Sequence, residues 1–137
     1  MTFPDSPVDL LRQLIRIPSV NPDSAPGQGA TGEAACAERV GDLLELLGAE
    51  VTFEEVLPGR PNVIGRFPGG EGKPGLLFAP HLDTVSVAGM TIDPFAGEVS
   101  GGRIHGRGAS DTKGTMAAML WALHEMRDDL SAFPVRV

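Results

Sequence analysis

The sequence has little cysteine, no long hydrophobic run and no leader-like start. Its single thiol, Cys36, cannot form an internal disulfide, which excludes a secreted disulfide-rich scaffold. The longest apolar run, 116–123, is much shorter than the roughly 20 residues that span a bilayer. The segment 1–11 lacks the basic and apolar regions of a signal peptide. These absences predict a cytoplasmic protein in which Cys36 is a small buried apolar residue.

Positive charge is also scarce. The chain carries 11 Lys and Arg against 18 Asp and Glu, a formal net charge of −7, and its basic residues do not cluster. Binding to nucleic acid needs a basic patch that neutralises phosphates, and an acidic surface is repelled by anionic lipids. We therefore expect neither a nucleic-acid partner nor a membrane partner.

The periodicity of apolar residues alternates between helical and strand-like segments. The 137 residues, of which 42% are hydrophobic, suit one domain or part of a larger one. Helices are predicted at 6–17, 31–48 and 112–127, and strands at 50–56, 62–67, 76–79 and 133–137, with a hairpin joining 96–99 to 103–105. Such alternation predicts an α/β fold in which helices flank a sheet.

Several residues predict where these elements end and which faces they bury. Ser6 and Pro7 are suited to the start of the first helix, and Gly48 to the end of the second. The run 76–79 is typical of a central strand covered on both faces. In the last helix the helical spacing predicts five inward residues: Met116, Met119, Leu120, Leu123 and Met126.

The first candidate for chemistry is a histidine and an aspartate two residues apart at the end of an apolar run. His81 and Asp83 would face the same way in extended backbone. One imidazole nitrogen could then donate to the carboxylate while the other binds a metal. The motif alone is weak, and a polar turn without function would also explain it.

The second candidate is the glycine-rich segment 106–114. A dinucleotide fingerprint would need a third glycine where Asp111 stands, and a Walker motif would need Lys113 to follow Gly114 rather than precede it. Both nucleotide patterns therefore fail. Asp111, at the mouth of the last helix, would suit a cation, or it would simply cap that helix.

Taken together and in order, three stretches resemble the M20 metallopeptidase family. They are Pro80-His81-Leu82-Asp83, then Asp93-Pro94-Phe95, then the glycine-rich segment 106–114. The resemblance implies that residues 1–137 are the N-terminal part of the catalytic domain. That domain has a mixed central sheet flanked by helices, like other zinc exopeptidases. It would be incomplete here, with the lid or dimerisation domain and the C-terminal catalytic part absent.

The resemblance also implies roles for individual residues. His81 and Asp111 would be metal ligands, with Asp111 bridging two divalent ions and joined to Thr112 by a cis peptide bond. Asp83 would be a catalytic residue that orients His81. The expected ions are Zn²⁺, with Co²⁺ or Mn²⁺ as alternatives. The implied activity is cleavage of an amide bond of an N-acyl amino acid or small peptide by a metal-activated water. For the full-length protein, a homodimer is one expectation.

The sequence departs from the family pattern at its end. Val137 is reached before the Glu-Glu pair that supplies the family's general base and a further ligand, and Glu125, Asp128 and Asp129 match no family position. We expect negligible hydrolysis from these residues alone.

Two alternatives to a hydrolase stay open at this point. One is a non-catalytic fold relative that acts as a binding module, although intact His81, Asp83 and Asp111 argue against it. The other is a phosphate binder, which the failed motifs disfavour. We expect Arg107 and Lys113 to pair with nearby acids rather than with a substrate carboxylate.

Overall fold

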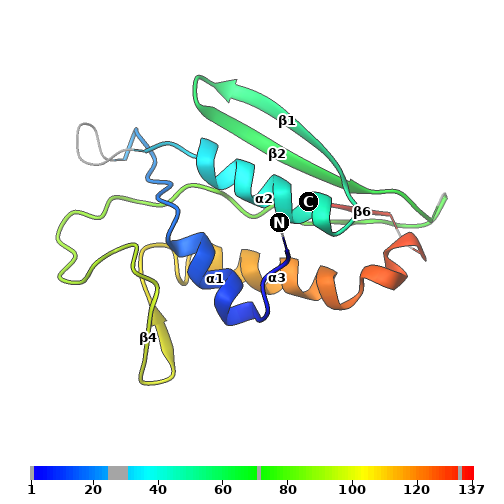
Figure 1. The fold of residues 1–137 in the computed structure, drawn as a ribbon. Coiled ribbons are helices and arrows are strands. Elements are labelled where there is room, and N and C mark those ends of the chain that lie inside the picture. Colours follow the sequence, from blue (N-terminus) through cyan, green and yellow to red (C-terminus); the bar gives the residue numbers. More distant parts are fainter. Residues whose placement is uncertain (1, 25–30, 71, 133) are drawn as a thin grey trace.

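The computed structural model describes residues 2–24, 31–70, 72–132 and 134–137, and it folds as helices packed beside a mixed sheet (Figure 1). The helices are α1 (Pro7–Ile15), α2 (Ala34–Leu46), α3 (Lys113–Glu125) and the 3₁₀ helix η1 (Arg127–Ala132). The strands are β1 (Glu50–Leu57), β2 (Arg60–Phe67), β3 (Leu76–Leu77), β4 (Glu98–Ser100), β5 (Arg103–His105) and β6 (Val135–Arg136).

The predicted start of α1 and the predicted end of α2 are confirmed by their local geometry, whereas α2 begins at Ala34 rather than at Thr31. The Ser6 side chain accepts a hydrogen bond from the backbone N–H of Asp9, and Pro7 occupies the first turn of α1. Gly48 follows α2 with a φ of +89°, a conformation in which glycine has no Cβ penalty. The Ser6 cap thus fixes the start of α1, and the turn glycine fixes the end of α2.

The main sheet has four strands in the order β1-β2-β6-β3. Strands β1 and β2 form an antiparallel hairpin with Val51 opposite Gly65, and β6 is antiparallel to β2. β3 runs parallel to β6, with Leu76 opposite Val135. The predicted α/β class with a mixed sheet is confirmed. The hairpin of β4 and β5 is also confirmed, and it turns at Gly101 and Gly102 as a separate two-stranded sheet.

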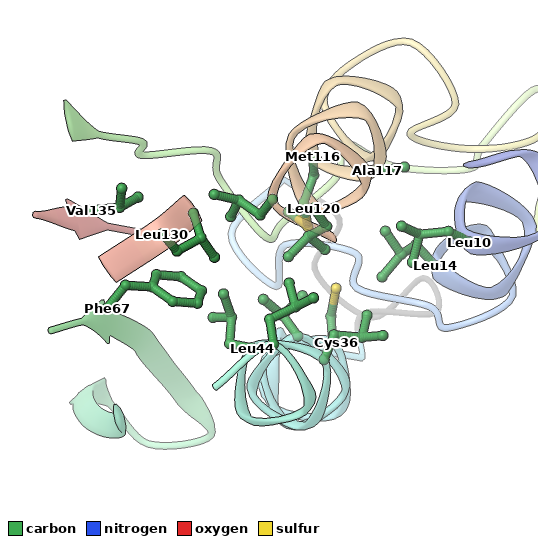
Figure 2. Packing of buried hydrophobic residues seen from close by; sticks show 14 residues of the cluster. Leu10, Leu14, Cys36, Leu44, Phe67, Met116, Ala117, Leu120, Leu130 and Val135 are labelled. Atoms are coloured by element: carbon green, nitrogen blue, oxygen red, sulfur yellow. The ribbon is translucent and has the colours of Figure 1, made fainter. Parts of the chain in front are cut away.

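The core lies between α2, α3 and one face of the sheet. Figure 2 shows Cys36 and Leu44 of α2 directed toward Leu120 of α3, with Leu10 and Leu14 of α1 at one side. Phe67 and Val135 close the core on the sheet side. Cys36 is fully buried, as predicted, and burial raises the pKa of its thiol, so it is held in the protonated form.

Two burial predictions are wrong. The run 76–79 is not a covered central strand: β3 is at the sheet edge, with Leu76 and Leu77 60% and 74% exposed. Among the described residues, no element packs over it. Met126 was predicted to face inward, but it caps the end of α3 and is exposed, because the helix stops one residue earlier. Phe133, at the start of the predicted last strand, lies outside the described residues.

Within the described ranges, no helix is long and apolar enough to cross a membrane.

Candidate metal centre

The candidate site is built on two chain segments that are far apart in sequence and lie side by side. The loop after α1 and the loop after β3 join through an isolated parallel bridge between Val20 and Thr84. Around it, the backbone N–H of Thr84 donates to the Ser19 carbonyl at 2.8 Å, and the Ser19 hydroxyl donates to the Leu82 carbonyl at 2.7 Å. Ser19 and Thr84 are buried, so these bonds fix the segment that carries His81 and Asp83.

His81 lies between two carboxylates. Its Nδ1 is 3.1 Å from the Asp83 carboxylate and 2.9 Å from the Asp83 carbonyl oxygen. Its Nε2 is 3.0 Å from Oδ1 of Asp111. The predicted His81–Asp83 contact is therefore present, and Asp111 joins it from 30 positions later in the chain. The structure brings all three predicted site residues together.

The two carboxylates differ in exposure. The Asp83 side chain is 32% exposed and the Asp111 side chain is 89% exposed, while His81 is 50% exposed. Partial burial of the ring lowers the pKa of His81. The hydrogen bond to Asp111, the Asp83 carbonyl and the two negative charges outweigh this effect and raise the pKa above its ordinary value. The site therefore favours positive charge on or beside the ring.

Asp111 is free of the capping role that competed with metal binding. Helix α3 begins at Lys113 with Thr112 at the N-cap position, and no side chain makes a capping hydrogen bond there. The Asp111–Thr112 peptide bond is cis, as the family resemblance implied.

Steric contacts, rather than phosphate binding, explain why the segment 106–114 contains glycines. Gly108 has a φ of +81°, and a side chain there would meet the Thr84 methyl group at 2.9 Å. A Cβ on Gly114 would collide with the Ala109 carbonyl oxygen. The close approach at Gly108 lets the loop that carries Asp111 pack against Thr84, next to Asp83, whereas the close approach at Gly114 lies within the glycine-rich segment itself.

Among the residues that the structure describes, Arg107 and Lys113 pair with no acid, so the expectation that they would do so is wrong. Lys113 is buried, and its ammonium donates to the carbonyls of Leu14 and Ile17 at 3.0 and 2.6 Å. Burial lowers the pKa of Lys113. Arg107 donates from Nη2 to the Ser86 carbonyl at 2.7 Å. Lys113 thus ties the start of α3 to the end of α1, where carbonyl groups lack helical partners.

One site residue was missed by sequence reasoning. The Nδ2 group of Asn21 donates to Oδ2 of Asp83 at 2.8 Å, across 62 positions of sequence. Asn21 was part of a segment predicted only as loop, and no spacing signal links it to His81. Only the pairing of the two loops places it beside the carboxylate.

The hydrogen-bonding roles of His81 and Asp111 suit a divalent ion at Nε2. With Nδ1–H donating to Asp83, the neutral ring presents an Nε2 lone pair to a carboxylate oxygen, and two acceptors then face each other. A second ring proton or a cation between them removes the conflict. Two ligand atoms on one tetrahedral zinc lie about 3.4 Å apart, close to the observed 3.0 Å.

The described residues alone do not complete a metal site. Within the ranges given above, no group of three or more His, Cys, Asp or Glu side chains is arranged to hold an ion. A groove of about 720 Å³ adjoins the site and contains His81 and Asp83 in its wall, together with Arg60 and apolar side chains that come mainly from β1 and β2. The centre is thus half formed and open on one side.

Comparison with known proteins shows which family the segment around this centre matches. The model of the family described as "Peptidase family M20/M25/M40" matches residues 77–137, which include His81, Asp83 and Asp111. The chain belongs to the M20 family. Asn21 lies outside the matched segment.

Curated relatives of this M20 chain are enzymes by name. The chain is 39% identical over 124 residues to a succinyl-diaminopimelate desuccinylase of Rhodospirillum centenum. The match covers 85% of this chain and 29% of that protein. It is 40% identical over 122 residues to the enzyme of the same name from Methylobacterium radiotolerans, covering 87% of this chain and 29% of that protein. The chain thus spans less than a third of the curated relatives it matches.

Solved structures agree with the M20 assignment. An M20 family metallo-carboxypeptidase from Sulfolobus solfataricus superposes with a TM-score of 0.80 at 27% identity, over 97% of this chain and 30% of that one. Human carnosine dipeptidase 1 shares the fold with a TM-score of 0.78 at 24% identity, over 96% of this chain and 31% of that one. The chain is therefore a partial M20 catalytic domain, and the expected zinc-exopeptidase-like fold is confirmed.

Proposed function

We propose that the protein containing these residues is a metal-dependent hydrolase. It cleaves the amide bond of an N-acyl amino acid or small peptide with a metal-activated water. The observation that carries the proposal is the convergence of His81 Nε2 and the Asp111 carboxylate, 3.0 Å apart, on one exposed point. The names of the curated relatives add that an N-succinyl amino acid is the first substrate to test.

The role of each residue follows from its contacts. Asp83 accepts from Nδ1–H and so leaves Nε2 as the nitrogen that binds metal, while its charge makes the ring a stronger ligand. Asp111 presents one oxygen toward His81, and its exposed carboxylate leaves the other oxygen for a second ion. A divalent ion, when bound, would lower the pKa of its bound water toward neutrality and polarise the carbonyl group of the substrate. We assign zinc to the site, with cobalt and manganese as alternatives.

Two ligands are too few for a tight site, since catalytic zinc ions usually have three protein ligands. We therefore assign the remaining ligands and the general base to parts of the protein outside residues 1–137. The lid or dimerisation domain and a homodimer belong to the same proposal. The binding-module alternative is not favoured, because it gives no reason for the alignment of His81 with Asp83 and Asp111.

The test is a metal-removal assay on the full-length protein. The protein is freed of metal with a chelator, and amine release from N-succinyl and N-acetyl amino acids and dipeptides is followed after adding Zn²⁺, Co²⁺ or Mn²⁺. We expect hydrolysis to return with metal in the wild type but not in His81→Ala. The control is His105→Ala, because His105 lies in β5 and takes no part in the hydrogen bonds and ion pairs recorded for the site in the described part of the chain. Hydrolysis that continues after chelation would overturn the metal-dependent mechanism, and no hydrolysis in the metal-loaded protein would favour the binding module.

A further inference from the structure

The Asp83 carboxylate is shared between two donors. Its Oδ1 is 3.1 Å from Nδ1 of His81, and its Oδ2 accepts from Nδ2 of Asn21 at 2.8 Å. With both oxygens held, the plane of the carboxylate cannot rotate without breaking one of the two bonds. Asn21 is therefore the first member of a continuous chain of contacts that runs through Asp83 and His81 to Asp111.

The amide of Asn21 can be assigned in only one orientation. Its Oδ1 accepts from the backbone N–H of Asp23 at 2.9 Å, so the NH₂ group must be the end that faces Asp83. A flipped amide would place an acceptor against a carboxylate and a donor against an N–H. The backbone N–H of Asn21 also donates to the Thr84 carbonyl at 2.9 Å. The side chain is thus fixed at both of its polar atoms.

We propose that Asn21 is a positioning residue of the metal centre. It holds the Asp83 carboxylate in the plane that accepts from Nδ1–H of His81, and so presents Nε2 to the ion. The inference rests on the proposed function, because it concerns the same site. It adds a residue that lies outside the segment matched by the family model.

Holding the loop does not require the bond between Asn21 and Asp83. The two loops are already joined by the Val20–Thr84 bridge and by the Ser19 hydroxyl bond to the Leu82 carbonyl. The local turn is already closed by Oδ1 of Asn21 and the N–H of Asp23. The Nδ2 donor is therefore the one polar contact of this side chain that acts on the site rather than on its own loop.

The experiment is a double-mutant cycle in the full-length protein, with Zn²⁺ affinity measured by competition with a chelator. Asn21→Leu removes the Nδ2 donor, together with the Oδ1 acceptor, while keeping the number of side-chain heavy atoms. Asp83→Ala removes the group through which Asn21 is proposed to act. We expect Asn21→Leu to weaken zinc binding about tenfold, the lower end of the range for residues that orient a ligand. In the Asp83→Ala background it should cause no further loss.

A matched control separates positioning from support of the loop. Thr31→Val removes the bond from the Val20 N–H to the Thr31 hydroxyl, 3.1 Å long, which holds the same segment without reaching Asp83. Zinc affinity should stay at the wild-type value in this variant. If Asn21→Leu does not fold, Asn21→Ser replaces it, because a serine hydroxyl can keep the turn but is too short to reach Asp83. The same tenfold loss is expected.

Each outcome has a distinct meaning. Equal losses for the Asn21 variant in both backgrounds, or no loss in the wild-type background, would overturn the positioning role. If His81→Ala loses zinc while the Asn21 variants keep it, only the Asn21 inference fails. If His81→Ala binds zinc as tightly as the wild type, the proposed function fails, and the inference fails with it.

Discussion

The two sides of His81 are organised differently. On the Nδ1 side, Asp83 is two-thirds covered and contacts Asn21 and His81 through separate oxygens. On the Nε2 side, Asp111 is 89% exposed, and the hydrogen bond or ion pair recorded for its carboxylate in the described part of the chain is the one to His81. One carboxylate is fixed by the fold, and the other projects into open space.

The difference separates orientation from ligation. A partly covered polar group has lost part of its contact with water and gains from partners within the protein, which explains why each oxygen of Asp83 has one. An exposed carboxylate opposite a histidine lone pair has oxygens free for a cation, which is what a bridging ligand requires. If this reading is correct, substitutions on the two sides should differ in size and in what they change.

The largest effect is expected from Asp111→Asn. The amide keeps the shape of the side chain but removes the negative charge from the proposed bridging position. We expect zinc affinity of the full-length protein to fall by more than about a hundredfold, beyond the range for residues that only orient a ligand. Isothermal titration of the metal-free protein measures this. Asp129→Asn makes the same charge change on η1, far from the site, and should bind zinc as the wild type does.

A smaller loss is expected from Asp83→Asn. The amide can still contact Nδ1 of His81, but it lacks the charge that strengthens the ring as a ligand. We expect zinc affinity to fall about 10- to 100-fold, as for other second partners of metal-bound histidines. The same titration gives the ranking of the two variants. A larger loss for Asp83→Asn than for Asp111→Asn would contradict the division between orientation and ligation.

Lys113→Met tests the support beneath Asp111 rather than the ligand itself. Methionine keeps much of the buried stem but leaves the carbonyls of Leu14 and Ile17 without their donor. We expect the free energy of unfolding to fall by about 1–2 kcal/mol, because relief from burying an ammonium offsets part of the lost hydrogen bonding. Urea unfolding of the metal-free protein measures this change.

The control for that measurement is Lys73→Met. The Lys73 ammonium donates to the Ala132 carbonyl at 3.1 Å in an exposed position, so its loss should cost less than about 0.5 kcal/mol. Equal losses for both lysine variants would show that the buried ammonium does not hold the two helices together.

The sequence was most informative where local chemistry decides the structure. Ser6, Pro7 and Gly48 act on their own helix ends, so their types alone located α1 and the end of α2. The order of the motifs around His81 and Asp111 led to the correct family and singled out three residues that lie together in the structure. Roles for these residues stay a prediction until metal binding is measured.

What the sequence could not provide depends on contacts across the fold. Asn21 meets Asp83 only because two loops pair through Val20 and Thr84. Lys113 was expected to find an acid, but its start-of-helix position points it into the core toward the end of α1. The apolar run that forms β3 predicted burial, and the sheet order instead leaves it at an edge. Composition gave no information on any of these placements.

The smallest effect concerns protonation of the His81 ring in the metal-free protein, and it compares the two sides of the ring most directly. Ring burial lowers the pKa of His81, while Asp111, the Asp83 carbonyl and both charges raise it, with a net rise above 6.5. A raised folded-state pKa means that the protonated ring stabilises the fold below the unfolded value. This contribution is lost as the pH rises through the folded value. Because the ring is half exposed, solvent screening keeps the gain in stability small.

NMR titration of the His81 ring should separate the two sides. The bond to the Asp111 side chain is the largest of the effects that raise the pKa, and Asp83 also acts through its backbone carbonyl, which Asp83→Asn retains. We therefore expect the titration midpoint to fall further in Asp111→Asn than in Asp83→Asn. A larger fall in Asp83→Asn would place the dominant charge on the buried side and reverse the comparison. In the wild type, zinc should suppress the titration altogether, because an ion at Nε2 replaces the second proton.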